Sequence, residues 1–427
     1  MKVAHVLRKY DCAEWGGTET AVLGLCAGLK SQGTASVVFA PRVPRRSSPD
    51  PLVAAGIAVR RYSALVPIWG LTPEQRQRLR AVGGNLLSFD LFWRLWGEPQ
   101  LDAIHSHALG RIGSIAGLVA RLRRIPFVLT LHGPVYNLPP SLAERYQPKN
   151  RGFDWGKICG ALLRSRDLLD RGDAIFTGNA EAASLVRRHH PLRRVIVHPH
   201  SIDLRAYQHD HRLEAESAYP RIRGRDLILA VGRIDPAKNQ AWLVEHWPET
   251  AKRLPNAHLM LVGAATDVTY LHAVQRRIDI LGLRDHITIA GGLPSGDPRL
   301  TGLMQAARAM VLPSLAESFG LVILDAWAAE TPIIAARNPG AESLIEHGRN
   351  GLLFQLHERQ EYLDCVVGAV KDPSFTARLI AGGRQSVSEF DRGRLAARML
   401  KVYRDLAEER LPRADLAEGV PDKCPPG

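Results

Sequence analysis

The sequence predicts an α/β protein made of two consecutive domains, each built on a doubly wound parallel sheet. Three observations lead to this expectation. The chain has 427 residues, which is more than one hydrophobic core usually serves. Short apolar runs alternate with helical patterns, and this implies parallel strands joined by right-handed crossovers. The alternation also ends and begins again near the middle of the chain, so the second half repeats the organisation of the first.

The first half opens with an expected strand over the apolar run 3–7. A loop that contains Gly16 and Gly17 follows, and the apolar-periodic stretch 21–29 is expected to form a helix. Another helix is expected over 111–124. The remaining strands of this half are expected at 37–40, 103–105, 127–130, 174–177 and 195–197. This order of elements predicts a first domain over residues 1–205.

The second half is expected to begin after a polar and charged stretch, which predicts a second domain over 206–385. A helix is expected over 321–330. Residues 386–411 are expected to form a terminal helix that packs back toward the first domain, and the tail 412–427 is expected to be flexible. The strands of the second half are expected at 227–231, 257–262, 287–289, 310–312 and 333–335.

Composition narrows the class of protein. Hydrophobic residues make up 45% of the chain and charged residues 23%, which is typical of a folded globular protein rather than a disordered one. The apolar N-terminal stretch is too short for a signal peptide, and no run of about 18 apolar residues occurs. The five cysteines are scattered, without CxxC or zinc-finger spacing. These features predict a cytoplasmic protein with no structural metal.

The net charge of +13 is concentrated in the first half of the chain. Residues 1–225 carry 33 Lys and Arg against 18 Asp and Glu, whereas residues 226–427 carry 23 against 25. A basic half suits anionic lipid, a phosphate-bearing substrate or nucleic acid, and the alternative is a solvated basic surface. Because no nucleic-acid-binding module is recognisable, nucleic acid is not expected as a partner.

Residues 69–96 do not fit a compact strand–helix unit. Arg76, Arg78 and Arg80 are followed by clustered aromatic residues that end at Trp93 and Trp96. Arginines beside such a cluster favour an interfacial membrane helix, and the alternative is an ordinary helix that packs its aromatic residues into the first domain. An anionic membrane surface is therefore a candidate partner, with peripheral association at the inner face of the plasma membrane as one interpretation.

The most specific chemical pattern lies over residues 311–326. A strand ends there, a loop carries Glu317, and a helix opens near Gly320. Backbone amides at a helix N-terminus, with glycine permitting close approach, form an anion site suited to a diphosphate. Asp325 follows Glu317 by eight positions, so one carboxylate can meet the sugar end of a ligand while the other reaches its ribose.

A second pattern follows the first strand of the second half. Arg233 and Lys238 come directly after this strand, at the ligand-binding edge of an open parallel sheet. Two cations at this edge can neutralise a departing diphosphate. A lone arginine–lysine pattern is weak evidence, but it becomes strong when combined with the Glu317 segment.

Together these residues resemble glycosyltransferase family 4, also described as glycosyl transferases group 1. These are retaining enzymes of the GT-B fold, in which two Rossmann-like domains face each other across a cleft. The family's late motif is Glu, seven residues and Glu, then a small-residue helix and a Thr-Pro turn. It reads here as Glu317-Ser318-Phe319-Gly320, Asp325-Ala326 and Thr331-Pro332. Other matching segments are Gly16-Gly17-Thr18-Glu19, 102–107, Leu131-His132-Gly133 and 350–353.

The resemblance implies a role for each matching residue. Arg233 and Lys238 are expected to contact the donor diphosphate, Glu317 the sugar hydroxyls, and Asp325 the ribose. His132 is expected over the reacting sugar, although a buried structural histidine is the alternative for it and for His107. The other implied donor-side residues are Gly16, Gly17, Gly232, Ser318, Phe319, Gly320 and Leu321. The candidate acceptor-side residues are Glu19 and His107.

The implied reaction transfers a sugar from a nucleoside diphosphate sugar to a glycan or lipid-linked acceptor with retention of configuration. Envelope polysaccharide, lipopolysaccharide or glycolipid synthesis in a bacterium is the expected context. No metal or other cofactor is expected, because the chain contains no Asp-x-Asp motif and fixed cations can replace a metal. The alternatives are a GT-B-fold sugar-nucleotide epimerase and a non-catalytic sugar-nucleotide-binding relative.

Two departures from the family pattern stand out. The second acid of the late motif is Asp325 instead of the usual Glu, which is one methylene longer. Residues 198–203 read His-Pro-His-Ser-Ile-Asp where the family usually shows Pro-Asn-Gly-Val-Asp. The segment between the domains is therefore expected to bend differently in this chain.

Overall fold

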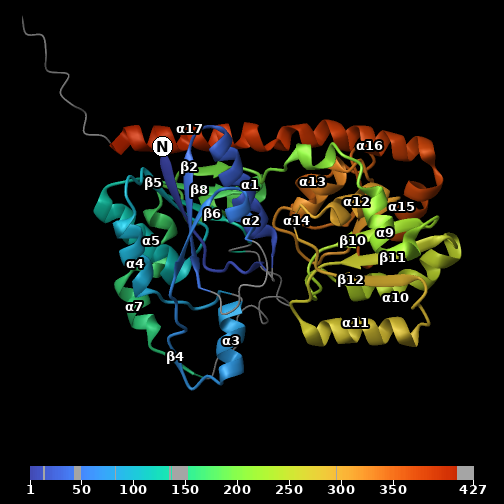
Figure 1. Cartoon of the computed structure of the whole chain (residues 1–427), viewed down its shortest axis with the longest axis horizontal. Helices are drawn as coiled ribbons and strands as arrows, with labels where there is room; N and C mark the ends of the chain where they lie inside the picture. The colour runs from blue at the N-terminus through green and yellow to red at the C-terminus, as the bar shows by residue number, and fades with distance from the viewer. Residues whose placement is uncertain are drawn as a thin grey trace, which may run out of the picture.

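Two parallel sheets, one in each half of the chain, form the centres of the two domains (Figure 1). The computed structural model describes residues 1–12, 15–42, 50–81, 83–133, 136, 152–294 and 296–410. The predicted fold class of two doubly wound α/β domains is confirmed. The expected flexible tail 412–427 lies outside the described residues.

The first sheet has seven strands in the order β3-β2-β1-β5-β6-β8-β9, and all of its pairings are parallel. Its strands are β1 (Lys2–Val6), β2 (Ala35–Pro41), β3 (Ala58–Tyr62), β5 (Ala103–Ser106), β6 (Phe127–Leu131), β8 (Ala174–Thr177) and β9 (Val195–Val197). The helices of this domain are α1 (Gly17–Ser31), α2 (Pro51–Ala54), α3 (Pro73–Ala81), α4 (Phe89–Gly97), α5 (Gly110–Arg123), α7 (Gly156–Leu162) and α8 (Ala180–His189). A separate antiparallel pair joins β4 (Ile68–Trp69) to β7 (Phe153–Asp154).

The second sheet has six parallel strands in the order β12-β11-β10-β13-β14-β15. Its strands are β10 (Asp226–Val231), β11 (Ala257–Val262), β12 (Ile287–Gly291), β13 (Ala309–Leu312), β14 (Ile333–Ala336) and β15 (Leu352–Phe354). Its helices are α9 (Arg212–Ala218), α10 (Gln240–Arg253), α11 (Val268–Ile280), α12 (Pro298–Ala306), α13 (Leu321–Ala328), α14 (Pro339–Glu342), α15 (Arg359–Lys371) and α16 (Pro373–Val387). The last helix, α17 (Arg392–Arg410), returns to the first domain.

Strand order fixes where a ligand can bind. In the first sheet the order reverses between β1 and β5, and in the second it reverses between β10 and β13. At such a reversal the crossover helices leave toward opposite faces and a crevice opens at the carboxyl ends of the two strands. Each domain therefore offers one binding edge, set by topology alone.

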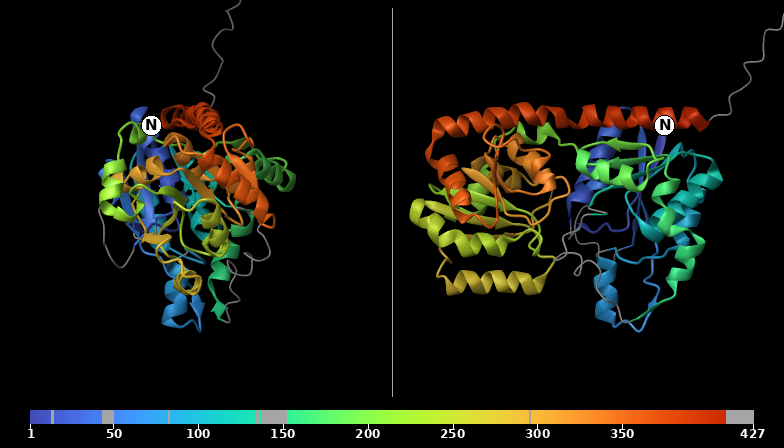
Figure 2. Two further views of the ribbon diagram at one scale, coloured as in Figure 1. Left: turned by 90° about the vertical axis from the view of Figure 1, so that its right-hand side faces the viewer. Right: turned by 180° about the vertical axis from the view of Figure 1, so that it is seen from behind.

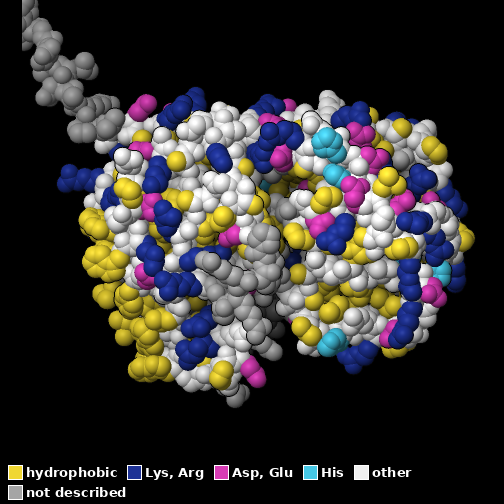
Figure 3. Space-filling view, in the orientation of Figure 1, with side chains coloured by type: hydrophobic (Ala, Val, Ile, Leu, Met, Phe, Trp, Pro, Cys, Tyr) yellow, Lys and Arg dark blue, Asp and Glu magenta, His cyan; other side chains and the backbone are white. Residues whose placement is uncertain are grey.

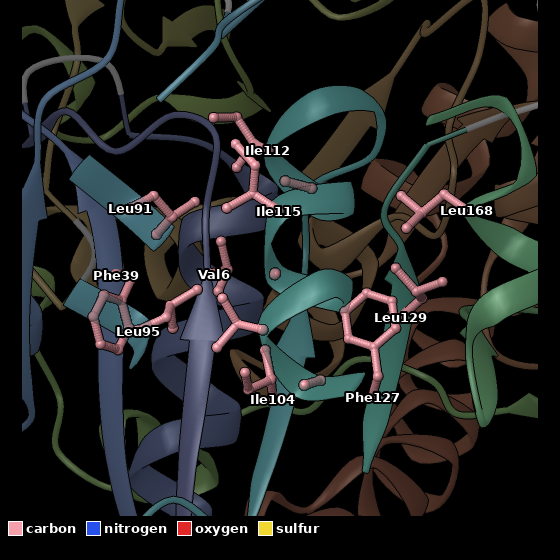
Figure 4. Close-up of a cluster of buried hydrophobic side chains, with 14 of the residues drawn as sticks. Val6, Phe39, Leu91, Leu95, Ile104, Ile112, Ile115, Phe127, Leu129 and Leu168 are labelled. Carbon is pink, nitrogen blue, oxygen red and sulfur yellow. The ribbon is translucent and has the colours of Figure 1, made fainter. Parts of the chain in front are cut away.

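Both faces of the first sheet are buried because helices cover each of them, and successive side chains of a strand point to opposite sides. Val6, Phe39, Ile104 and Leu129 pack on one face under α4 and α5 (Figure 4). The other face contacts α1 and α17, and the fully buried ring of Tyr403, on α17, packs against its strands. The C-terminal helix is thus part of the first domain's core.

The terminal helix differs from the expectation for 386–411. Helix α16 ends at Val387, a 3-10 turn covers Ser388–Phe390, and α17 begins only at Arg392. Asp391 lies between them with an extended backbone, and its Oδ1 accepts a hydrogen bond from the backbone N–H of Arg394. Asp391 therefore caps the new helix after the break.

The chain crosses between the domains twice, and the two crossings touch. The backbone N–H of Ile202 donates to the carbonyl of Phe390 at 3.0 Å, and the N–H of Arg392 donates back to Ile202 at 3.1 Å. An ion pair of 2.7 Å between Arg392 and Asp203 also holds the two crossings together. From there α17 runs along one side of the molecule toward the first domain (Figures 1 and 2).

Candidate active site

The carboxyl edges of the two sheets face each other, and a few contacts join them. The side-chain amide of Asn179, which follows β8, donates to the carbonyl of Ser318 in the second domain at 2.9 Å. The ring of Phe319 lies against Gly178, where an added Cβ would meet it at 3.4 Å. The surface is hollowed between the two domains (Figure 3). The predicted site residues from both halves therefore border one space.

The central charged pair joins Lys238 to Glu317. Lys238 Nζ donates to Glu317 Oε1 at 2.5 Å, and Ser314 Oγ donates to the same oxygen at 2.6 Å. The Oε2 atom of Glu317 has no hydrogen bond among the described residues, so it is available to a ligand. Arg233 completes the group, with Nη2 3.2 Å from Asp235 Oδ2.

Asp235 builds the turn that positions both cations. Its Oδ1 accepts from the backbone N–H groups of Ala237 at 3.0 Å and Lys238 at 3.3 Å. Because its Oδ2 also pairs with Arg233, one buried carboxylate orients the two basic side chains. Asp235 was not predicted as a site residue, although it comes four positions after the end of β10 and Asp is a usual turn-forming residue.

Two glycines bring the backbone close to Glu317 and to the start of α13. A Cβ at Gly340 would lie 2.4 Å from the carbonyl oxygen of Glu317, so only glycine allows this approach. Gly320 has φ +91° and caps α13 without a side-chain hydrogen bond. The amides of Leu321 and Val322 are therefore left for an anionic ligand, as helix N-termini provide, whereas that of Ile323 already donates to the carbonyl of Gly320.

Asp325 lies one turn into α13 and has a partner that the sequence did not indicate. The hydroxyl of Tyr207 donates to its Oδ1 at 2.8 Å. Burial raises the pKa of Asp325 to about 6, and the hydrogen bond from Tyr207 opposes that rise. Tyr207 belongs to the 3-10 turn Leu204–Tyr207 in the segment between the domains.

In the first domain a row of histidines runs from the sheet to the site. His5 Nδ1 lies 3.2 Å from His107 Nε2, and His107 Nδ1 lies 2.8 Å from His132 Nε2. The ring of His132 also stacks on His200, with centroids 5.2 Å apart, and His200 meets Phe319 of the second domain edge-on. The structure thus brings His132 and His107 together, and His200, from the segment between the domains, packs against His132.

Burial keeps these rings neutral. It lowers the pKa of His107 and His132 well below the usual range, and it lowers that of His5 to about 3. Each neutral ring therefore has one N–H donor and one acceptor nitrogen, so neighbouring rings in the row can hydrogen-bond to one another. A cavity of about 20 Å³ behind the row is lined by His107, His132 and His200, and it has room for one water molecule.

His5 and His107, together with the buried His105 on β5, have ligand atoms within 4.8 Å of one another. The two nitrogens of His105 are already engaged, with Tyr403 Oη and Thr130 Oγ1 each at 2.6 Å. His107 uses both of its nitrogens as well. These residues therefore fit a hydrogen-bonded network better than a metal centre.

The loop after β1 places the remaining predicted residues. Gly16 precedes α1, and an added Cβ at Gly17 would lie 3.7 Å from Leu321 of the second domain. Glu19 is buried, and burial raises its pKa, while backbone hydrogen bonds from Gly16 and Glu19 and the nearby Lys9 and Arg233 oppose the rise. A Glu at this position of a helix that reaches back to the preceding amide is a capping residue. The structure therefore gives Glu19 a structural role beside its candidate role toward an acceptor.

In addition to Asp235, sequence reasoning missed several other residues of the site. Asn179 follows β8 and caps α8, His200 lies in the segment where the chain departs from the family pattern, and Tyr207 contacts Asp325. The signal for Asn179 was present, since it comes two residues after a strand end. The contact of His200 with Phe319 becomes visible only when the two domains are placed together, whereas that of Tyr207 with Asp325 forms within the second domain.

Gly232 completes the predicted set. It follows β10 with φ +157°, and the side chain of Lys238 packs 3.5 Å from the position that its Cβ would take. Gly263, after β11, approaches it so closely that a Cβ there would lie 1.9 Å from the Gly232 carbonyl oxygen. Gly263 was not predicted, although it too follows a strand.

Comparisons with known proteins agree with this arrangement. Residues 16–223 match the family model of the glycosyl transferase 4-like domain, and residues 225–372 match that of glycosyl transferases group 1. A D-inositol 3-phosphate glycosyltransferase of Mycolicibacterium paratuberculosis is 28% identical over 369 residues, covering 84% of this chain and 78% of that protein. The boundary between the two matched models, at residues 223–225, lies between the last strand of the first sheet and the first strand of the second.

Solved structures share the fold. The Anabaena protein HepE, in complex with UDP and glucose, superposes with a TM-score of 0.71 at 19% identity and covers 95% of this chain and 100% of its own. Sucrose-phosphate synthase from Thermosynechococcus elongatus has a TM-score of 0.72 at 18% identity and covers 96% and 99%. The two domains thus have the GT-B arrangement. The chain belongs to the GT4-type glycosyltransferases.

Proposed function

We propose that this glycosyltransferase moves a sugar from a nucleoside diphosphate sugar to a hydroxyl acceptor with retention of configuration. The observation that carries the proposal is the group of Lys238, Glu317 and Arg233 at the point where the second sheet reverses its order. The uncapped N-terminus of α13 lies next to it in the chain. Two cations and free backbone amides suit a diphosphate, and a carboxylate beside them suits sugar hydroxyls.

Binding of the donor would exchange partners within this group. The Lys238 ammonium, held by Glu317 in the free protein, would turn to the more highly charged diphosphate. Glu317 would then accept hydrogen bonds from the sugar, while Ser314 keeps its carboxylate in place. In the free protein, the ion pair with Glu317 therefore keeps the Lys238 ammonium in the site without leaving its charge unpaired.

The proposed chemistry is a same-face substitution at the sugar's anomeric carbon. Its bond to the diphosphate oxygen breaks as a bond to the acceptor oxygen forms, and the acceptor proton passes to the departing oxygen. Lys238 and Arg233 stabilise the negative charge that develops on the diphosphate, and no metal ion is required. The neutral ring of His132, fixed by His107 and His200, positions the sugar.

For the acceptor, we propose a hydroxyl of a glycan or of a lipid-linked sugar in bacterial envelope polysaccharide, lipopolysaccharide or glycolipid synthesis. The excess of 33 basic over 18 acidic residues in 1–225 supports an acceptor that carries negative charge. Arg8, two residues after the end of β1, is exposed and would supply one cation for this acceptor. The similar proteins named for D-inositol 3-phosphate motivate the inclusion of that phosphate among the acceptors tested.

The test is donor turnover by the full chain with UDP-, GDP- and ADP-sugars, with and without EDTA. Lys238→Ala should lower turnover by at least about 100-fold, a typical loss for one electrostatic stabiliser. The matched control is Lys252→Ala, an exposed lysine on α10, which should remain fully active.

Three outcomes would contradict parts of this proposal. A fully active Lys238→Ala protein would remove the role of the cation. Complete loss of activity in EDTA with rescue by a divalent metal would show that fixed cations are insufficient. Conversion of a nucleotide sugar to its epimer without an acceptor would indicate an epimerase instead.

A further inference from the structure

The outer edge of the first domain exposes large apolar side chains from several elements. We call this surface the aromatic edge. Its members are between 46% and 81% exposed and comprise Trp69, Phe89, Trp93, Trp96, Leu122, Phe153, Ile158 and Leu162. Hydrophobic side chains gather along the same side of the molecule, over α4, α7 and β4 (Figure 3). A contiguous apolar surface of this kind marks a binding surface rather than ordinary solvent exposure.

Helix α4 is apolar on both of its sides. Leu91 and Leu95 are fully buried against the core, while Trp93 and Trp96 are 68% and 46% exposed on the outside. Between them Phe92 stacks parallel to Trp96, at 6.2 Å between ring centroids. A helix on the surface of a soluble domain normally presents polar residues outward, so the outer side of α4 lacks a partner.

Two neighbouring elements extend the surface. Trp69 and Phe153 are directly paired across β4 and β7, with ring centroids 5.8 Å apart, and both are more than 60% exposed. On α7, Ile158 and Leu162 point outward with 64% and 81% exposure. Because α5 packs against both α4 and α7, these side chains belong to one edge. That edge lies away from the second domain (Figures 1 and 2).

The charges around the aromatic edge leave a surplus of cations. The nearby carboxylates are neutralised, since Asp90 pairs with Arg94 and Asp154 with Arg111. By contrast, a set of exposed basic residues has no carboxylate partner in the described part of the chain, namely Arg121, Arg124, Lys157 and Arg166. The cations also crowd one another: burial lowers the pKa of Arg171, and the charges of Arg121 and Arg164 lower it further.

We propose that the aromatic edge docks this protein on an anionic lipid bilayer. Exposed tryptophans flanked by long basic side chains match the boundary between headgroups and acyl chains, where indole rings settle and cations meet lipid phosphates. No helix in the described ranges is long and apolar enough to cross a membrane, so the contact would be peripheral. A second copy of the chain fits less well, because pairing two such edges would bring unpaired cations together.

The docking proposal is independent of the proposed reaction, since it rests on a surface and not on the site. Its test is co-flotation of the full chain with vesicles of phosphatidylcholine alone or mixed with phosphatidylglycerol, in the absence of any donor. Binding should require the anionic lipid, weaken with salt, and shift tryptophan fluorescence to the blue. The Lys238→Ala variant should bind vesicles as the wild type does, even if it has lost donor turnover.

Two sets of variants separate the apolar and the charged contributions. Trp93→Gln with Trp96→Gln should abolish flotation. Leu213→Gln with Ile280→Gln, which changes two even more exposed side chains on α9 and α11 of the second domain, should not affect it. Lys157→Gln and Arg166→Gln should each weaken binding to anionic vesicles about fivefold. Because all of these side chains are exposed, the unfolding temperature should stay constant and serves as the folding control.

Several results would overturn the proposal. They are an absence of binding to either vesicle, equal binding to both, or undiminished binding by the Trp93→Gln, Trp96→Gln variant. Sedimentation would identify the main rival. If the wild-type chain self-associates and the tryptophan variant is a monomer, the aromatic edge joins two copies of the protein instead.

Discussion

At the scale of single residues, Asp325 shows how the site departs from a fold optimised for stability. Its folded pKa of about 6 lies above its ordinary value of 3.8 because burial disfavours the charged form. A group whose pKa rises on folding contributes stability that is complete below its unfolded pKa and is lost as pH rises through its folded pKa. Above about pH 6 the ionised Asp325 therefore costs the folded state free energy.

Replacing this carboxylate tests that cost. Asp325→Asn should stabilise the protein by about 1–3 kcal/mol at pH 8 and by almost nothing at pH 3.5, because a shift of one pKa unit corresponds to about 1.4 kcal/mol. The amide oxygen can still accept the hydrogen bond from Tyr207. The measurement is the free energy of unfolding at both pH values, with Asp364→Asn, an exposed residue on α15, as the control.

Function should move in the opposite direction. If Asp325 accepts hydrogen bonds from the donor ribose, the Asn variant should raise the donor KM about 10-fold or more with a smaller change in kcat. The wild-type donor KM should likewise rise as the pH falls below about 6, where the carboxylate takes up a proton. Equal stability of variant and wild type at pH 8, or an unchanged donor KM, would contradict this account.

The site could be predicted from the sequence where one local motif supplies the chemistry. Lys238 and Arg233 follow a strand, and Glu317 follows the strand beside it, so the parallel sheet brings them together. His200 could not be assigned in this way, and for Asn179 the sequence offers only its place two residues after a strand end. Their contacts with Phe319 and Ser318 depend on how two separately folded domains are docked, and no local pattern encodes that placement.

At the scale of elements, the apolar runs identified the interior strands because both faces of a parallel sheet are buried. Strand β3 was missed because Arg60 and Arg61 interrupt its pattern. The structure explains them, since β3 is an edge strand whose arginines form ion pairs with Glu98 and Asp50. The break before α17 was missed for a different reason, because it depends on a hydrogen-bonded contact with the distant Ile202.

The packing of α1 on α17 depends on one glycine. A Cβ at Gly28 would lie 2.7 Å from the Cβ of Ala396 and 2.9 Å from the carbonyl oxygen of Arg392. Both distances are shorter than atoms tolerate, and one partner is backbone, so α17 would have to move. The same helix carries Tyr403, whose hydroxyl lies 2.6 Å from the ring of His105.

Gly28→Ala should therefore destabilise the protein by about 1–3 kcal/mol, although alanine normally stabilises a helix relative to glycine. The matched control is Gly368→Ala in α15, where the added Cβ would make an ordinary contact of 3.7 Å with Phe375. This control should be neutral or stabilising by about 0.4–1 kcal/mol. Unfolding in denaturant measures both variants. If Gly28→Ala is as stable as Gly368→Ala, the two helices do not need this close contact.

At the scale of the whole molecule, the two domains are joined by a compact double crossing and by few contacts across the site. The crossing is held by the paired backbones at Ile202 and Arg392. Across the site, the contacts include the hydrogen bond from Asn179 to Ser318 and the rings of His200 and Phe319. A hinge with a small opposing contact allows the domains to separate and close around a ligand.

The Asn179 hydrogen bond offers a way to change this equilibrium without disturbing either domain. Its Oδ1 caps α8 by accepting from the backbone N–H of Ala182 at 2.8 Å, while its Nδ2 donates to Ser318. Asn179→Asp keeps the cap, since Asp and Asn are equally good at this position. The substitution removes the donor and places a negative charge against the Ser318 carbonyl. It therefore acts on the contact between the domains alone.

In the free protein, Asn179→Asp should favour the separated arrangement and give a larger radius of gyration by small-angle scattering. The nucleoside diphosphate of the active donor should restore the wild-type value, because a ligand held by both domains favours their closure. The donor KM should rise about 2- to 10-fold, the cost of one hydrogen bond, since a smaller fraction of molecules is ready to bind. Asn338→Asp is the control, because it makes the same change at a cap inside the second domain, where Nδ2 donates to Ser314. That control should lower stability without altering the radius of gyration. If Asn179→Asp leaves both the radius and the donor KM unchanged, the domains are held together by the hinge and α17, and closure around the donor does not depend on this contact.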